Sequence, residues 1–332
     1  MNKQPVIEPR LSPGLSLRPV KWADAEAVAK LIYDGCVADG DVIAALTPEE
    51  IRHEWESDSF NLETDAILVE TEDGHVVGHE ELTSRHDYSR MYFDGYVHPE
   101  FKGRGIGTIL LRTLEVRARE EMMKAEPDVR VVVRCTMSSG DVDGRELHEN
   151  EGYHPVRYQY RMEIKLEEAP PAPVWPEGIE LRPFIRERHE RSVWQAQNES
   201  FRDNWESQDV SFEDFVHHRF DDPEYDPSLW AIAWDGEEVA GFSLNRYRMG
   251  IGWIRTLGVR HPWRKKGLGL ALLQHSFGEY YKRGMRTIGL GVDASNPTGA
   301  TRLYQRAGMY VASEFVIYEK ELRPGRDLVG AS

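Results

Sequence analysis

The chain has 332 residues, of which 41 are lysine or arginine and 57 are aspartate or glutamate, so its formal net charge is −16. An acidic surface repels phosphate backbones, and no apolar run approaches the roughly 18 residues that cross a bilayer, so the composition excludes general nucleic-acid binding and membrane-spanning helices. With 40% hydrophobic and 10% aromatic residues, the sequence predicts two globular domains in a cytoplasmic protein, since its first residues also lack the apolar core of a signal peptide.

The two cysteines, Cys36 and Cys135, are too few for a disulfide framework, and no cluster of cysteine and histidine has zinc-ligand spacing. We therefore predict no metal site, and we expect both cysteines to be small buried hydrophobes rather than nucleophiles. Most of the excess negative charge lies before Ala169. That charge would attract a cationic substrate or partner, although solubility is the simpler explanation.

The same order of elements occurs twice along the chain. It begins with an apolar alternation typical of a strand, at 15–19 and again at 179–183, followed by a charged helical stretch. Two strands joined by an Asp-Gly turn come next, with the turns at 73–74 and 235–236. Because Asp-Gly tolerates positive φ, each pair of strands is predicted to be a β-hairpin.

A further strand and a glycine-rich loop follow each hairpin, and each loop leads into a helix. The loops lie at 102–107 and 264–269, and the helices after them carry apolar residues at intervals of three and four. Each repeat then has a short β-branched strand and a last helix that ends at a glycine, Gly152 or Gly308. The repeat therefore covers nearly the whole chain.

A proline-rich segment separates the two copies. Four prolines in seven residues cannot continue a helix or a central strand. We therefore predict a semi-rigid linker at 169–177, between an N-terminal domain at 1–168 and a C-terminal domain at 178–332.

Each glycine-rich loop is a candidate phosphate site. Backbone N–H groups are unpaired at a helix N-terminus, and the helix dipole favours anions there. The glycines at 105, 107, 267 and 269 are expected to remove Cβ atoms that would hold a pyrophosphate off the backbone. Basic side chains are expected to supply matching positive charge, namely Lys102, Arg104, Arg264, Lys265 and Lys266.

Two other kinds of phosphate site fit these loops poorly. Neither loop has the Gly-Lys-Ser/Thr ending of a P-loop. A dinucleotide-binding oxidoreductase requires a third glycine, but Thr108 and Leu272 occupy the corresponding positions. Both loops also come late in their domains, after an antiparallel hairpin rather than at the start of a βαβ unit.

The loops instead match a basic residue, two further residues and Gly-x-Gly after a strand. With LGVRHPWRKKGLGLALL at 257–273 and NPTGATRLYQRAGM at 296–309, the chain resembles the GNAT superfamily of N-acetyltransferases. Its tandem layout resembles two-domain bacterial members of the mycothiol synthase type. The resemblance implies an α+β fold of two tandem domains. Each would be a mixed β-sheet flanked by helices, with the fourth and fifth strands splayed apart to admit the pantetheine arm of CoA.

The resemblance also implies where acetyl-CoA, the co-substrate, binds. It places the pyrophosphate on the loop at 264–269 and the thioester along the strand before that loop, where one main-chain N–H donates to the oxyanion. The implied CoA-binding residues of the C-terminal half are Leu257, Gly258, Val259, Arg264, Lys265, Lys266, Gly267, Leu268, Gly269, Asn296 and Tyr304. Those of the N-terminal half are Val97, Lys102, Gly103, Arg104, Gly105, Ile106 and Gly107.

The resemblance makes Tyr304 the predicted general acid, eight residues after Asn296. A phenol stays protonated at pH 7 and can give its proton to a departing thiolate, although a helix tyrosine can also serve only for packing. The general base stays open. Glu199, Asp203 and Glu206 lie on the substrate side of the implied cleft, where a carboxylate could hold an ammonium group or relay its proton through water.

The N-terminal half departs from this pattern. The position equivalent to Tyr304 is His148, and the position equivalent to Asn296 is Gly140. An imidazolium can protonate a thiolate, but a solvated helix histidine is the simpler expectation. We therefore expect this half to retain CoA affinity or only the scaffold, with weak or absent catalysis. Carboxylates that could still line its cleft are Glu80, Glu81 and Asp94.

Together these features predict an acyl-CoA-dependent N-acyltransferase, active in its C-terminal half, in which an amine attacks acetyl-CoA directly. The acceptor would be a small-molecule or peptide amine that the sequence does not name. The alternative is a non-catalytic acyl-CoA sensor or scaffold, which the altered N-terminal motif favours. The oligomeric state is left open between a monomeric pseudo-dimer and a homodimer.

Overall fold

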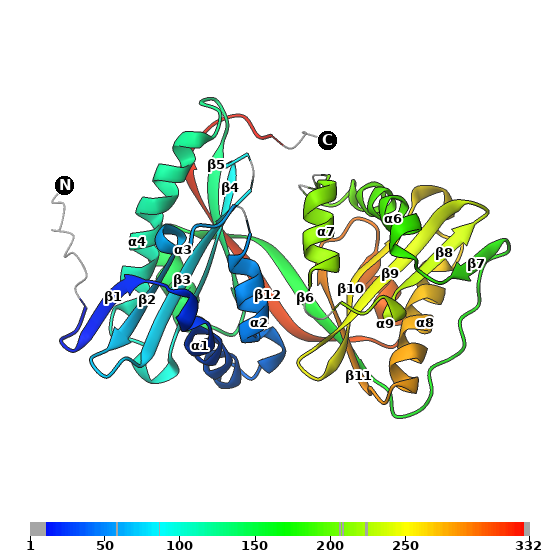
Figure 1. Cartoon of the computed structure of the whole chain (residues 1–332), viewed down its shortest axis with the longest axis horizontal. Helices are drawn as coiled ribbons and strands as arrows, with labels where there is room; N and C mark the ends of the chain where they lie inside the picture. The colour runs from blue at the N-terminus through cyan, green and yellow to red at the C-terminus, as the bar shows by residue number, and fades with distance from the viewer. Residues whose placement is uncertain are drawn as a thin grey trace. The chain divides into compact units, whose positions relative to one another are not determined.

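The computed structural model describes residues 11–57, 59–85, 87–205, 207, 209–222 and 225–328. Glu206, one of the candidate bases, lies outside these residues. The helices and strands form the predicted mixed α+β fold, and the chain divides into two compact units (Figure 1). Unit 1 takes the chain as far as Val156 together with the part from Val316 onward, and unit 2 takes Arg157–Phe315.

Unit 1 is built on a sheet whose strands follow chain order. The strands are β1 (Leu15–Pro19), β2 (Ala66–Thr71), β3 (Val76–Ser84), β4 (Arg90–Val97) and β5 (Val131–Ser138). The first four pair antiparallel, and β5 pairs parallel to β4. The helices are α1 (Ala25–Ala38), α2 (Pro48–Trp55), α3 (Leu62–Asp65), α4 (Ile106–Glu121) and α5 (Val142–Asn150).

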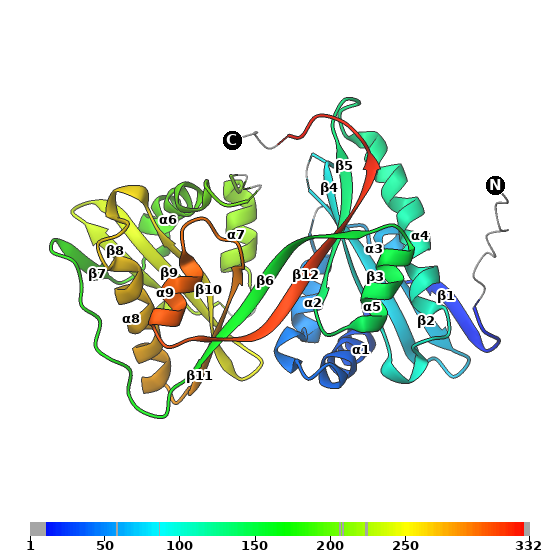
Figure 2. The same ribbon diagram turned by 180° about the vertical axis from the view of Figure 1, so that it is seen from behind.

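Helices cover both faces of the unit 1 sheet. A Cβ placed on Gly78 of β3 would lie 2.6 Å from Ile106 of α4 and 3.1 Å from Leu110. The Tyr96 ring of β4, which pairs with the next residue of β3, lies beside Gly35 of α1. Since neighbouring strand positions point to opposite faces, α4 and α1 lie on opposite sides of the sheet (Figure 2).

Unit 2 repeats this plan. Its strands are β6 (His154–Lys165), β7 (Ile179–Arg182), β8 (Ala231–Asp235), β9 (Glu238–Arg248), β10 (Ile251–Val259), β11 (Thr287–Asp293) and the first part of β12 (Tyr310–Arg323). Its helices are α6 (Arg186–Phe201), α7 (Phe212–Phe220), α8 (Leu268–Lys282) and α9 (Ala300–Arg306). Strands β7 to β10 pair antiparallel in succession, and β11 pairs parallel to β10.

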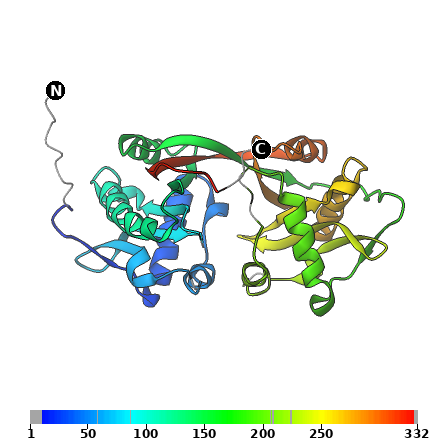
Figure 3. The same cartoon turned by 90° about the horizontal axis from the view of Figure 1, so that it is seen from above.

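Residue size along β8 explains how helices pack on the two faces of this sheet. Ala231 and Ala233 contact Leu268 and Leu272 at the start of α8, where small side chains let the helix approach closely. Ile232, between the two alanines, belongs to the apolar cluster formed with α6 and α7. Figure 3 shows α6 in green and α8 in orange on opposite sides of the yellow strands.

The strand that follows each sequence repeat, β6 or β12, begins in one unit and ends in the other. Strand β6 pairs antiparallel with β11, from Lys165 opposite Thr287 to Gln159 opposite Asp293. The later part of β12 belongs to unit 1, where Glu319 accepts hydrogen bonds from Arg134 of β5. The compact units therefore do not coincide with the predicted domains 1–168 and 178–332. The segment 169–177, which forms no helix or strand, joins β6 to β7 within unit 2.

In both units the two parallel strands pair only over part of their length. The pairing of β10 with β11 joins Gly252 to Ile288 and Trp253 to Gly289, close to the start of both strands. An irregularity in the β9–β10 register follows at once, between Ile254 and Thr256. Beyond it β10 and β11 diverge, which is the splay that the sequence predicts.

Both cysteines are buried, as predicted, with 5% of Cys36 and 6% of Cys135 exposed. Burial raises the pKa of the Cys135 thiol, which disfavours the nucleophilic thiolate. Among the described residues, no helix is both long enough and apolar enough to cross a membrane.

Candidate active site

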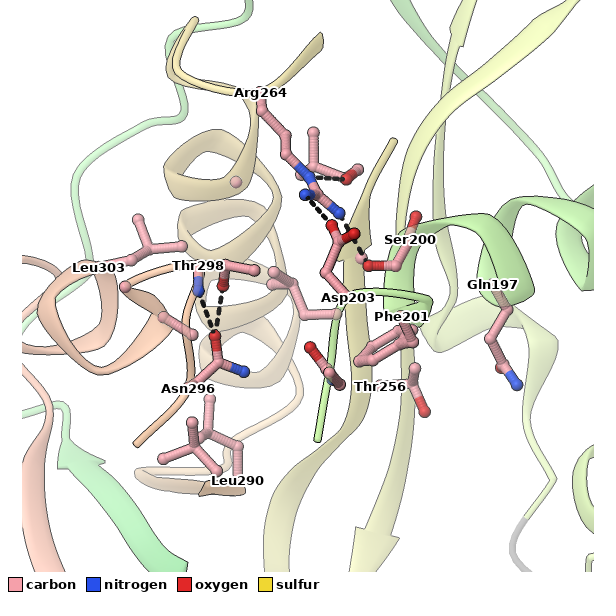
Figure 4. A pocket seen from close by; sticks show the side chains of 18 of the residues that line it. Gln197, Ser200, Phe201, Asp203, Thr256, Arg264, Leu290, Asn296, Thr298 and Leu303 are labelled. Atoms are coloured by element: carbon pink, nitrogen blue, oxygen red, sulfur yellow. Dashed lines mark hydrogen bonds and ion pairs between the residues drawn. The ribbon is translucent and has the colours of Figure 1, made fainter. Parts of the chain in front are cut away.

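A cleft of about 1080 Å³ opens in unit 2 where β10 and β11 diverge. Its walls come from α6, α7, β10, the loop before α8, β11 and α9. In Figure 4, Asn296 and Leu303 lie on one side, Gln197 and Thr256 lie on the other, and Arg264 lies at one end. The cleft therefore brings the predicted loop, the edge of β10 and the α9 region into one space.

Gly267 caps the N-terminus of α8 and leaves open space in front of it. It is the N-cap residue with φ +91°, a left-handed conformation, and an added Cβ would meet no atom within 4 Å. The first N–H groups of α8 have no acceptor within the helix, so the open space in front of Gly267 suits an anion. Lys265 also has positive φ, which for a residue with a side chain stores strain in this loop. The equivalent residue of unit 1 is Gly103.

The second glycine of each loop has a different role from the predicted one. A Cβ on Gly269 would lie 3.1 Å from Leu303 of α9, and a Cβ on Gly107 would lie 2.9 Å from Leu147 of α5. Because Gly269 has no side chain, α9 can pack closely against the start of α8. Gly107 allows the same close packing of α5 against the start of α4. Only Gly105 and Gly267 face open space at their helix starts.

Arg264 turns back toward its own unit and ties the loop to α6. Its Nη1 donates to Asp203 Oδ2 at 2.8 Å, its Nη2 to the Ser200 carbonyl at 2.9 Å, and its Nε to the Val259 carbonyl at 3.0 Å. Lys265 and Lys266 are exposed, so their positive charges lie at the surface of the loop. Of the three predicted cations, Arg264 therefore positions the loop, and the lysines remain accessible to a ligand.

The backbone of β10 presents unpaired groups to the cleft. The Arg260 N–H donates to the Ala240 carbonyl beside β9, so in an antiparallel ladder the groups of Gly258 also point toward β9. The groups of Leu257 and Val259 then point the opposite way, toward the diverging β11. Since Arg264 occupies the Val259 carbonyl, the N–H groups of Leu257 and Val259 are the donors available at this edge.

Tyr304 lies in the cleft wall on α9, with 6% of its surface exposed. Burial raises its pKa to about 12, so the hydroxyl is protonated at neutral pH. Asn296 lies in the loop before α9, and its side-chain oxygen accepts from the Thr298 N–H at 2.9 Å. This oxygen therefore shapes the turn, and the amide nitrogen is the polar atom of Asn296 that remains for a ligand.

The two candidate bases that the structure describes, Glu199 and Asp203, are both held in ion pairs. Asp203 accepts from Arg264 and from His261, whose Nε2 lies 2.7 Å away, and these two hydrogen bonds lower the Asp203 pKa. Glu199 is held by Arg260 at 2.7 Å. The other described carboxylate of the cleft, Asp293, is paired with Arg157 at 2.7 Å.

A second cleft of about 500 Å³ lies in unit 1 and includes the predicted Val97, Gly103, Gly105, Ile106 and Gly107. His148 lines it at the position of Tyr304, and its Nδ1 lies 2.8 Å from the Gly144 carbonyl. Since a carbonyl only accepts, Nδ1 carries the proton, and burial lowers the His148 pKa. The lowered pKa disfavours the imidazolium form, which is the form that could protonate a thiolate.

Sequence reasoning missed Arg219, which lines the unit 2 cleft from α7. The only signal available was a basic residue close to the end of a short amphipathic helix, and most such residues are solvated. Its position beside Thr256 of β10 depends on tertiary contacts that no local pattern specifies.

Comparisons with known proteins agree with this geometry. The acetyltransferase (GNAT) family matches residues 39–133 and 191–309. The chain is 30% identical over 233 residues to a mycothiol acetyltransferase of Thermobispora bispora, covering 68% of this chain and 74% of that protein. It is 28% identical over 250 residues to the mycothiol acetyltransferase of Streptomyces scabiei, covering 74% and 75%.

Solved structures extend the likeness over both units. A GCN5-related N-acetyltransferase from Sphaerobacter thermophilus has a TM-score of 0.81 and 37% identity, covering 97% of this chain and all of that one. A tandem GNAT protein from the clavulanic acid biosynthesis pathway has a TM-score of 0.71 over 94% of this chain; at 16% identity it supports the fold alone. The chain therefore belongs to the GNAT family of acetyltransferases and is a tandem member resembling the mycothiol synthase type.

Proposed function

We propose that unit 2 transfers the acetyl group of acetyl-CoA to the amine of a small molecule. The observation that carries this proposal is the protonated Tyr304 hydroxyl in the same cleft as the unpaired β10 edge. The relatives named as acetyltransferases of mycothiol, a small molecule, support the class of acceptor.

The cleft suits acetyl-CoA at each of its parts. The open α8 N-terminus at Gly267, with Lys265 and Lys266 beside it, fits the charge of a pyrophosphate. The gap between β10 and β11 suits the narrow pantetheine arm, and the Asn296 amide nitrogen is available to donate to it. The thioester carbonyl would then meet the N–H groups of Leu257 and Val259, which can donate to its oxygen.

The reaction follows from these positions. A neutral amine attacks the thioester carbon, the C–N bond forms, and the oxyanion is held by the β10 N–H groups. As the C–S bond breaks, Tyr304 donates its proton to the departing sulfur and is later reprotonated from solvent. Since the described carboxylates of the cleft, Asp203 and Asp293, are both in ion pairs, the amine proton leaves to water.

Unit 1 plays a different part in this proposal. Its loop and cleft are retained, but the lowered pKa of His148 disfavours the protonated form that would act as the acid. We infer that unit 1 keeps the CoA-shaped cleft without efficient transfer, and that turnover arises in unit 2.

The test follows free thiol while the full-length protein is incubated with acetyl-CoA and a panel of amines. Amine-dependent thiol release that is lost in Tyr304→Phe supports transfer in unit 2. Tight CoA binding without release from any amine would instead favour a sensor or scaffold. Release that persists in Tyr304→Phe but disappears in His148→Ala would place the reaction in unit 1 and overturn this assignment.

A further inference from the structure

Arg219 is a cation in the wall of the unit 2 cleft without a carboxylate partner among the described residues. Its Nη2 donates to Thr256 Oγ1 at 3.1 Å and lies 3.4 Å from the Gln197 side-chain oxygen. Its Nε is buried and has no hydrogen-bond partner in the described part of the chain. All three side chains line the cleft, so a guanidinium group that has no ion-pair partner among the described residues forms part of this wall.

The surroundings of Arg219 favour an added negative charge. Arg255 and Arg246 lie close enough to act on it electrostatically, and Asp222, a carboxylate that also acts on it, is in ion pairs with both of them. Burial, followed by Arg255, lowers the Arg219 pKa to about 9, so the group is still charged at pH 7. A buried cation without an anion is costly, and a bound anionic group would offset that cost.

The fold itself does not require an arginine here. Arg219 is the last residue but one of α7, and Glu54 is the last but one of the corresponding helix, α2. The β4 residue at the place of Thr256 is Asp94. Unit 1 therefore carries acidic side chains at both positions while keeping the same architecture, which argues against a purely structural need for Arg219.

We propose that Arg219 binds an anionic group of the acceptor, so that the amine substrate also carries a carboxylate. This inference rests on the proposed transfer in unit 2. Thr256, which Arg219 contacts, directly precedes Leu257, whose N–H faces the thioester position. The anion is therefore held next to the point of attack, and the substrate class is a compact amino acid rather than an amine of neutral or cationic chemistry.

The experiment uses the full-length protein and matched acceptor pairs in which a carboxylate is replaced by a neutral amide, such as an amino acid and its carboxamide, each compared at equal concentration of the neutral amine. We expect the carboxylate form to have the higher kcat/KM. In Arg219→Met its KM should rise roughly tenfold or more, with kcat for saturating acceptor changing less, because one charge-assisted hydrogen-bond partner is lost. The kcat/KM for the carboxamide should stay within about twofold, and Arg219→Lys should restore part of the preference.

Arg191→Met is the matched control, because this exposed arginine stacks on Phe212 of α7 outside the cleft. Acetyl-CoA binding and thermal unfolding of each variant separate a local effect from misfolding. If Arg219→Met unfolds, Arg219→Gln provides the same loss of charge with a polar side chain.

The outcomes distinguish the two proposals. Equal use of the carboxylate and carboxamide forms, unchanged by Arg219→Met, overturns the inference while leaving transfer intact. A preference for an amine that carries a phosphate, abolished by the same substitution, supports the anion site with phosphate as its source. No thiol release from acceptors of any charge removes the proposed function itself.

Discussion

The Asp203 carboxylate accepts a hydrogen bond from Arg264 at 2.8 Å and thereby joins the residues just after α6 to the loop that begins α8. Asp203 had been a candidate base, and Arg264 a candidate phosphate ligand. Their pairing gives both a positioning function: Arg264 also holds the Ser200 and Val259 carbonyls, so that one guanidinium fixes three segments around the loop. The shape of the α8 N-terminus therefore depends on an interaction outside the loop itself.

Asp203→Asn should weaken acetyl-CoA binding without abolishing the chemical step. Replacing the carboxylate by an amide removes the charge from a hydrogen bond that holds the loop, and a roughly three- to tenfold rise in the KM for acetyl-CoA follows. The value of kcat should remain within about twofold. Steady-state kinetics against acetyl-CoA measures both, and a kcat that falls a hundredfold with KM unchanged would restore Asp203 as a base.

Tyr304→Phe should lower kcat by roughly 100-fold, because the phenyl ring keeps the packing of α9 but has no proton for the departing sulfur. Calorimetric binding of CoA should change little, since the hydroxyl is one donor among many. Tyr310→Phe, at an exposed position of β12, is the matched control and should retain wild-type turnover. Wild-type turnover in Tyr304→Phe as well would remove this hydroxyl from the mechanism.

Gly267→Ala should raise the KM for acetyl-CoA and also lower stability. A left-handed conformation costs an L-residue about 1–2 kcal/mol, and relaxation of φ would turn the α8 N–H groups away from the phosphate position. Gly250→Ala is matched to it, because Gly250 has φ +80° and an equally open surface in the β9–β10 turn. The two variants should lose similar stability in thermal unfolding, but Gly267→Ala alone should change the KM. An equal KM for acetyl-CoA in Gly267→Ala and Gly250→Ala would contradict a phosphate site at the α8 N-terminus.

The parts of the molecule that the sequence predicts are those encoded by short segments. The Asp-Gly hairpins and the loops at 102–107 and 264–269 each depend on neighbouring residues, so a local pattern specifies them. The splay and the position of Tyr304 are predictions of the family resemblance, and in unit 2 a register irregularity lies between Ile254 and Thr256, next to the point where β10 and β11 diverge.

The parts that the sequence did not predict depend on contacts between distant segments. Strand β6 directly follows the first repeat in sequence, but it pairs with β11 of the second repeat. The alternation of apolar and polar residues in β6 does not specify which sheet edge the strand joins. Similarly, Glu199 and Asp203 had suitable positions for a base, but the arginines that neutralise them, Arg260 and Arg264, lie about 60 residues later. Pairing of this kind is invisible to motif spacing.

The buried Glu80 of unit 1 should make stability depend on pH in a specific direction. Glu80 is 5% exposed and lines the unit 1 cleft; burial, followed by the charge of Asp94, raises its pKa well above the ordinary value. The folded state therefore binds this proton more tightly than the unfolded chain does. Glu80 destabilises the fold increasingly as pH rises above its unfolded pKa of about 4.3, and the effect vanishes below that pH.

Glu80→Gln removes the titrating group while keeping its size. It should raise the unfolding temperature at pH 8 by roughly 2–4 °C for each kcal/mol added to the free energy of unfolding, with the gain shrinking toward pH 5. Glu100→Gln, at an exposed position, is the control and should change little across the same range. Thermal unfolding of the full chain at a series of pH values measures the difference. A gain that is constant with pH would show that packing, and not ionisation of Glu80, is responsible.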